Sequence, residues 1–127
     1  MNNFVVWFDI PVKNLDRAMK FYSTVMSVEL KSMEIGPGKQ ANFPFVPGVA
    51  SGSLRESKES EPSAAGTMVY LNGGEDLSAP LARVEAAGGT IIKNKTRIGE
   101  NGFMAIFKDT EGNHVALHSR CRGGRTP

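Results

Sequence analysis

The sequence lacks the features that are typical of disulfide-bonded, membrane-spanning and nucleic-acid-binding proteins. It has a single cysteine, Cys121, so no disulfide can form within the chain, and the Gly/Arg-rich residues around it offer no activating base for a reactive thiol. No apolar run approaches the roughly 18 residues of a membrane-spanning helix, and no signal peptide is recognisable. The net charge of +2 is small, and no basic stripe is interleaved with aromatic residues. We therefore expect a cytoplasmic protein that binds neither nucleic acid nor a membrane.

The composition that is present is typical of one soluble globular domain. Apolar residues make up 40% of the 127 positions and charged residues 22%, which leaves enough apolar surface for a core. A chain of this length is expected to form a single domain over residues 1–127.

Residues 14–26 carry the clearest periodic pattern. Their apolar side chains recur with the i, i+3, i+4, i+7 spacing that turns one stripe toward a core: Leu15, Ala18, Met19, Tyr22, Val25 and Met26. Asn14 is suited to cap this helix, and Asp16 suits the positive end of its dipole. Residues 4–10 are β-branched and aromatic, which predicts a strand that is buried on both faces except at Asp9 and ends at Pro11.

The rest of the chain predicts three strands, a polar segment and a second copy of the same order. Strands are expected at residues 27–33, 42–46 and 49–55, with a turn at 36–38. Residues 56–66 are polar and charged, which favours a flexible linker or a mobile loop. Further strands are expected at 68–72, 90–94, 103–107 and 114–118, and a helix at 76–87. Because Pro80 is tolerated only in a first turn, this helix is expected to start late, with Ser78 as its cap.

The two halves align at an offset of 62, which pairs Trp7 with Val69 and Tyr22 with Val84. A period this long that occurs twice is typical of a duplicated βαβββ unit. We therefore expect an α+β fold of two modules, at about 3–55 and 67–119, with a tail at 120–127. Each helix would lie outside its sheet, and the two curled mixed sheets would surround an open, barrel-like cleft.

Three phrases of the sequence resemble one known superfamily. They are IPVKNLDRAMKFY at residues 10–22, DLSAPLARVEAAGGTI at 76–91 and FKDTEGNHVALHS at 107–119. With the duplicated plan, they are similar to the vicinal oxygen chelate superfamily, which contains the glyoxalases, bleomycin resistance proteins and extradiol dioxygenases. The resemblance implies the fold strongly and the reaction weakly. It also implies a homodimer, and it leaves open whether each cleft is built within one chain or between two.

The resemblance further implies a divalent metal in the cleft, held by a histidine in the first strand of a half and a glutamate in the last strand. Such a metal lets two neighbouring substrate oxygens chelate it. This sequence departs from the pattern, with Trp7, Val69 and Ala116 at these positions, and a further ligand would fall near Ser51 or Ser53. We therefore expect no metal site and no cofactor.

Two polar residues are expected in the cleft. Strand alternation places Asp9 on the face of Trp7 and His118 on the face of Ala116. Asp9 and His118 are a candidate general base with its orienting group, or two ligands of a weakly bound metal. The competing interpretation is that both are structural residues at strand ends. His114 follows a turn and is expected to be exposed.

Trp7 is the only tryptophan and offers a flat wall with one N–H donor for a ligand ring. Phe43, Phe45 and Phe103 are candidates to extend this lining, while core filling is the competing interpretation for Trp7. The favoured function is the binding of a small molecule, aromatic ones included, in an apolar cleft without the usual metal. The alternative is a lyase, isomerase or dioxygenase-like enzyme that uses Asp9 and His118, and a catalytically silent member is a third interpretation.

Overall fold

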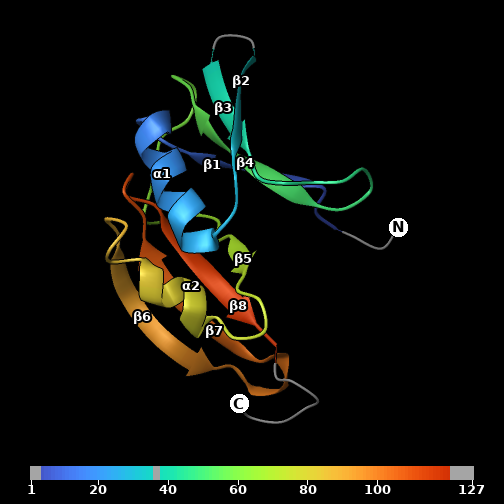
Figure 1. The fold of residues 1–127 in the computed structure, drawn as a ribbon, viewed down its shortest axis with the longest axis vertical. Helices are drawn as coiled ribbons and strands as arrows, with labels where there is room; N and C mark the ends of the chain where they lie inside the picture. Colours follow the sequence, from blue (N-terminus) through green and yellow to red (C-terminus); the bar gives the residue numbers. More distant parts are fainter. Residues whose placement is uncertain (1–3, 36–37, 121–127) are drawn as a thin grey trace.

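The computed structural model describes residues 4–35 and 38–120, which fold into two modules of the same element order (Figure 1). The first module consists of β1 (Trp7–Pro11), α1 (Leu15–Met26), β2 (Lys31–Ile35), β3 (Gly38–Asn42) and β4 (Ser51–Glu56). The second consists of β5 (Tyr70–Asn72), α2 (Ser78–Arg83), β6 (Thr90–Arg97), the 3-10 helix η1 (Gly99–Asn101), β7 (Phe103–Lys108) and β8 (His114–Ser119). The expected duplication of a βαβββ unit is therefore confirmed.

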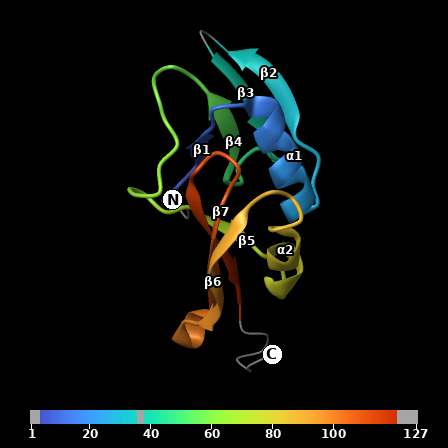
Figure 2. The same cartoon turned by 90° about the vertical axis from the view of Figure 1, so that its left-hand side faces the viewer.

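Each module builds a mixed four-stranded sheet with its helix on one face (Figures 1 and 2). The strand orders are β1-β4-β3-β2 and β5-β8-β7-β6, and in each sheet the first strand of the module pairs in parallel with the last. The two modules follow one another along the long axis of the molecule, and in the described part of the chain no strand pairing closes them into a barrel. The α+β class is confirmed. Among the described residues, no helix combines the length and the apolar composition that a membrane crossing requires.

The helix α1 matches its prediction closely at its start. The side chain of Asn14 accepts a hydrogen bond from the backbone N–H of Arg17 at 3.0 Å, which is the expected cap. Phe21 lies outside the predicted stripe but is buried, because its ring packs against that of Phe107 in the second module, with 5.6 Å between the ring centroids. The helix therefore buries a wider arc than one sheet would require. Other members of the stripe are also buried: Leu15, Ala18, Tyr22 and Val25.

The turn between β7 and β8 joins the second module to the first. Asp109 at its start accepts a hydrogen bond from the buried hydroxyl of Tyr22, with 2.6 Å between the two oxygens. Asn113 at its end donates through Nδ2 to the backbone oxygen of Pro11 at 2.7 Å. Burial raises the pKa of Tyr22, and the negative charge of Asp109 and its hydrogen bond raise it further.

Glu111, in the middle of this turn, anchors the start of α1. Its Oε1 accepts from the backbone N–H groups of Lys13 and Asn14 at 2.8 and 2.9 Å, and its Oε2 accepts from Arg17 Nε at 2.7 Å. Burial by itself raises the pKa of Glu111, but hydrogen bonds from Arg17, Asn14, Thr110 and Lys13 outweigh it and lower the pKa to about 2. The carboxylate also lies at the positive end of the helix dipole, so it stays charged far into acid.

Several strand limits differ from the predictions. β1 begins at Trp7 rather than at residue 4, and Phe4, Val5 and Val6 are exposed rather than buried. Among the described strands β1 pairs only with β4, and this edge position lets it include Pro11, which lacks a backbone donor. β2 begins at residue 31 rather than 27. Of the strand predicted at 42–46, only Asn42 lies in a strand, at the end of β3, and residues 43–46 form a loop.

The segment expected as a flexible linker is held near its middle. The backbone N–H of Ser63 donates to Asn113 Oδ1 at 3.0 Å, and the Ser63 carbonyl accepts from the backbone N–H of His114 at 3.4 Å. The linker is therefore fastened to the turn that joins the two modules. Gly36 and Pro37 of the expected turn lie outside the described residues, as does Cys121.

The second helix starts late, as predicted, but it begins at Ser78 itself, one residue earlier than a Ser78 cap implies. Leu77 occupies the N-cap position of α2, and Asp76 Oδ1 accepts from the backbone N–H of Ser78 at 2.9 Å, so Ser78 is not the cap. Pro80 lies in the first turn, where its missing N–H costs nothing. α2 ends at Arg83 rather than 87, and β6 continues to residue 97 rather than 94.

The offset of 62 between the halves holds for the helices, where buried Leu15 and Tyr22 match buried Leu77 and Val84, but it is wrong by one residue for the first strands. Residues 7–12 and 68–73 share nearly the same order of buried and exposed positions, so the first strands match at an offset of 61. The burial pattern agrees, because Leu71 is buried while Tyr70 and Asn72 are exposed. Side chains alternate along a strand with a period of two, so a one-residue error exchanges the two faces. Met68 rather than Val69 therefore matches Trp7, and Tyr70 matches Asp9.

Candidate functional site

The face of the first sheet that is turned away from α1 carries most of the predicted site residues. The strand register aligns its side chains in rows across the four strands. One row is Asp9, Ser53, Asn42 and Lys31, and the next is Pro11, Arg55, Gln40 and Met33. Trp7 lies one step along β1 from Asp9, opposite Ser51. We call these residues the open face.

A short hydrogen-bonded chain orients the two site residues of β1. The indole N–H of Trp7 donates to Ser53 Oγ at 3.3 Å, and Ser53 Oγ donates to Asp9 Oδ1 at 2.6 Å. Ser53 is fully buried between them, whereas Asp9 is exposed. The carboxylate of Asp9 is thus held in place and still accessible to a ligand. Trp7 and Asp9 share one face, as predicted.

A second polar chain crosses the neighbouring strands. Arg55 Nη1 donates to Gln40 Oε1 at 3.0 Å, and Gln40 Nε2 donates to Asn42 Oδ1 at 2.8 Å. Asn42 Nδ2 in turn lies 3.9 Å from the sulfur of Met33. The open face is therefore mixed in character, which corrects the expectation of an apolar wall. Polar side chains can occupy this face because their donors and acceptors satisfy one another.

The aromatic part of the open face lies around Phe45. Its ring packs edge-on against that of Trp7, with 5.3 Å between the centroids, and 55% of the residue is exposed. Phe45 and Phe43 line a pocket of about 450 Å³, together with Asn42 and Met33. Asn42 and Met33 also end the second chain of contacts, so the pocket adjoins the open face. Phe43 is itself buried and packs against the core ring of Tyr22.

Phe103 lies apart from these rings. It is buried on β7 in the core of the second module, and the Lys95 ammonium lies 4.6 Å from the centroid of its ring. The structure therefore brings Trp7 together with Phe45, places Phe43 at the adjoining pocket and leaves Phe103 in the other module.

Asp9 and His118 have separate partners. His118 lies on β8 in the row of Asn72 and Met104, and its Nε2 is 2.6 Å from the backbone oxygen of Asn101. That oxygen only accepts, so this nitrogen carries the proton and donates. Within the described part of one chain, no hydrogen bond or ion pair joins His118 to Asp9. His114 is half-buried, since the linker packs against its backbone.

The residues present do not fit the metal site that the resemblance implies. The corrected register places Trp7 and Met68 at the first-strand positions, and Tyr70, the counterpart of Asp9, pairs with Ala116 on β8. Hard divalent ions prefer carboxylate oxygens and imidazole nitrogens, and these positions supply neither. Among the described residues, no group of three or more His, Cys, Asp or Glu side chains is placed to hold a metal ion.

Sequence reasoning missed the polar residues that organise the open face. The sequence points to Ser53 only as one of two positions near a possible metal ligand, whereas in the structure it connects Trp7 to Asp9. Gln40 was not assigned to any strand, because the third strand was expected at 42–46. The polar–apolar–polar order of Gln40, Ala41 and Asn42 is a signal for a strand at these positions, and Pro44 is a signal against the strand at 42–46.

Comparisons with known proteins agree on the fold. The family model described as Glyoxalase/Bleomycin resistance protein/Dioxygenase superfamily matches residues 4–117. Comparison with curated protein sequences finds no match. Similar solved structures include hypothetical protein SA1046 from S. aureus, with 21% identity, a TM-score of 0.68, and coverage of 94% of this chain and 95% of that one.

The chain covers almost all of one further similar structure and less than half of another. TnmS3, an antibiotic binding protein from Streptomyces sp. CB03234, is 22% identical with a TM-score of 0.64, over 94% of this chain and 98% of that one. Glyoxalase I from Zea mays is 19% identical with a TM-score of 0.66, over 91% of this chain but only 44% of the maize chain. At these identities the likeness shows the fold alone.

Proposed function

Because the chain belongs to the glyoxalase, bleomycin resistance protein and dioxygenase superfamily, we propose that it binds a small molecule on the open face without a metal ion or other cofactor. One observation carries this proposal. Trp7 stands where the resemblance implies a metal-binding histidine, and its indole is oriented by Ser53 and flanked by Phe45. An oriented, half-buried indole is a surface on which a flat ligand can stack.

The polar groups of the open face define the rest of the ligand. The exposed carboxylate of Asp9 accepts hydrogen bonds, so it favours a hydroxyl or amine on the ligand. Arg55 carries a positive charge on the neighbouring strand and donates to Gln40. A ligand with an aromatic ring and hydroxyl or amine donors fits this arrangement. The similarity to TnmS3, whose printed description is an antibiotic binding protein, supports a binding role over a catalytic one.

The enzymatic alternative requires Asp9 and His118 in one site. Within one chain the two residues lie on different sheets and bond to different groups, so the binding role is favoured. Metal analysis of the purified protein separates the two functions. Stoichiometric bound metal that is lost from an Asp9→Asn variant would favour the enzyme.

We also propose that the protein works as a homodimer in the cytoplasm, with the open face completed by a second chain. Six large apolar residues near the open face are exposed: Phe4, Val5, Val6, Phe45, Val46 and Val49. They lie in two segments, one before β1 and one between β3 and β4, which project from the same end of the first sheet (Figure 1). Exposed apolar patches of this kind are typical of interfaces.

Sedimentation equilibrium tests the dimer. Val46→Asp is expected to yield a monomer, whereas Ile92→Asp, at an exposed apolar position on β6, is the matched control and should leave the mass unchanged. A monomeric wild-type protein would refute the shared site.

Trp7 fluorescence tests ligand binding directly, since it is the only indole. Titration with aromatic alcohols and amines is expected to give saturable quenching. Asp9→Asn should weaken binding about tenfold, because a hydrogen bond to a charged acceptor contributes about 1.5 kcal/mol or more. Asp16→Asn, which removes the same charge from the exposed side of α1, is the control. Quenching that is absent across a broad panel would leave the proposal without support.

A further inference from the structure

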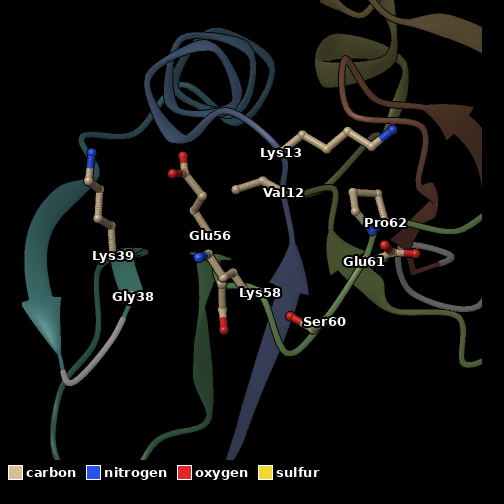
Figure 3. Close-up of a pocket in the computed structure, with 10 residues that line it drawn as sticks. Val12, Lys13, Gly38, Lys39, Glu56, Lys58, Ser60, Glu61 and Pro62 are labelled. Carbon is tan, nitrogen blue, oxygen red and sulfur yellow. The ribbon is translucent and has the colours of Figure 1, made fainter.

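We propose a second binding site, a pocket at the edge of the first module that takes a small molecule carrying a phosphate or carboxylate group. The pocket encloses about 370 Å³ and is built by residues at the end of β1, the start of β3, the end of β4 and the segment that follows β4 (Figure 3). This volume lies near the lower end of the range for small-molecule pockets. It suits an oxyanion with a small organic part.

The pocket lies on the opposite side of the sheet from the open face. Gln40 and Arg55 pair across β3 and β4 on the open face, and the next pair along is Lys39 with Glu56. Successive side chains of a strand point to opposite faces, so Lys39 and Glu56 point to the side of α1. The two sites therefore share one sheet but no surface, and this inference is independent of the proposed function.

The walls of the pocket are fixed by contacts that hold both strands and the following segment. Glu56 Oε1 accepts from the backbone N–H of Leu15 at 2.8 Å, which fastens β4 to the start of α1. A Cβ on Gly38 would lie 2.7 Å from the Glu56 backbone oxygen, so only glycine allows this close approach. Beyond the pocket, the hydrogen bond from Ser63 to Asn113 holds the segment that carries Lys58 and Pro62.

The charges of the lining favour an anion. In the described part of the chain, no ion pair or hydrogen bond engages the ammonium groups of Lys13, Lys39 and Lys58. Glu56 points its carboxylate toward α1, where the helix dipole balances the charge (Figure 3). Glu61 lies at the far end of the pocket, beside Pro62 (Figure 3).

The lining holds three lysines and two glutamates, so its net charge is positive. Charge of one sign within a concave, fixed wall concentrates the opposite ion, and lysine is a common point-charge partner of phosphate. Lys39 and Lys58 both line this pocket, and among the described residues neither ammonium group has another partner. We infer that these lysines are the principal contacts of the ligand.

Nitrogen-15 NMR titration of the full chain with inorganic phosphate and, separately, with succinate tests the site and distinguishes the two oxyanions. At least one anion is expected to shift the amide signals of Gly38, Lys39 and Lys58 with saturation. Lys39→Gln and Lys58→Gln should each weaken that binding at least fivefold. Glu61→Gln should strengthen it two- to threefold, because the repelling carboxylate is removed. All three side chains line the surface of the pocket, so these variants are expected to fold.

Lys93→Gln, which removes the same charge from an exposed position on β6, is the matched control and should leave the affinity unchanged. Shifts that grow linearly to the highest anion concentration, or an equal loss in the control and the pocket variants, would overturn the proposal. Neither result would bear on Trp7 fluorescence, so failure here is distinguishable from failure of the open-face site.

Discussion

Removal of the Glu111 carboxylate should destabilise the protein more than any change on its surface. The carboxylate accepts hydrogen bonds from the backbone N–H groups of Lys13 and Asn14, from two nitrogens of Arg17 and from the hydroxyl of Thr110. These bonds join the second module to the start of α1. Glu111→Ala leaves two main-chain donors without an acceptor, at about 1–3 kcal/mol for each buried one.

The expected loss is about 3 kcal/mol, at the low end of the range for breaking a buried ion pair, because the Arg17 side chain is 50% exposed and can turn to water. The lowered pKa gives a similar figure. The difference between 4.5 and about 2 corresponds to about 3 kcal/mol, at about 1.4 kcal/mol for each pH unit. For a domain of this size the melting temperature should fall by about 10 °C.

The pH dependence has a definite sign. A carboxylate whose pKa is lower in the folded state stabilises the fold above the unfolded pKa, and this contribution is lost as the pH falls through the folded pKa. The stability difference between wild type and Glu111→Gln should therefore be largest above pH 5 and shrink between about pH 4.5 and 2. Asp76, whose pKa is also lowered to about 2 by hydrogen bonds from Ser78 and Lys95, is present in both proteins and cancels.

Urea denaturation at a series of pH values measures both effects, and Glu85→Ala at an exposed position is the control. A loss below about 0.5 kcal/mol in Glu111→Ala, the usual size of a surface effect, would refute the view that this turn holds the modules together. If the difference in unfolding free energy between wild type and Glu111→Gln stays constant from pH 5 to pH 2.5, the charge assigned to Glu111 is refuted.

Three further predictions concern single buried contacts. Tyr22→Phe removes one of several donors to Asp109 and should cost about 1–2 kcal/mol in urea denaturation, whereas the same change at an exposed tyrosine should cost little. Ser53→Ala leaves the indole N–H without its acceptor, so tryptophan emission should shift and stability should fall by about 1 kcal/mol. Gly102→Ala should lower the melting temperature clearly more than Gly99→Ala. Both glycines have positive φ, but only a Cβ on Gly102 would overlap neighbouring backbone. Equal effects of the two glycine changes would contradict this reading.

The sequence by itself determined the features that depend on neighbours along the chain. The helix at residues 15–26 and its Asn14 cap follow from a 3.6-residue period and one short polar side chain. The first-turn position of Pro80 follows from its missing N–H. The duplicated order of elements and the family likeness also come from the sequence, because each module repeats the same local signals.

Only the tertiary structure decided which side chains meet. Alternation along a strand cannot fix the face when the register is uncertain by one residue, so the sequence aligns Trp7 with Val69 where the structure aligns it with Met68. Ser53 acquires its role from residues more than 40 positions away, and Glu111 binds the start of α1 across more than 90. Such contacts depend on how the strands and the two modules pack together, and the local sequence does not determine that packing.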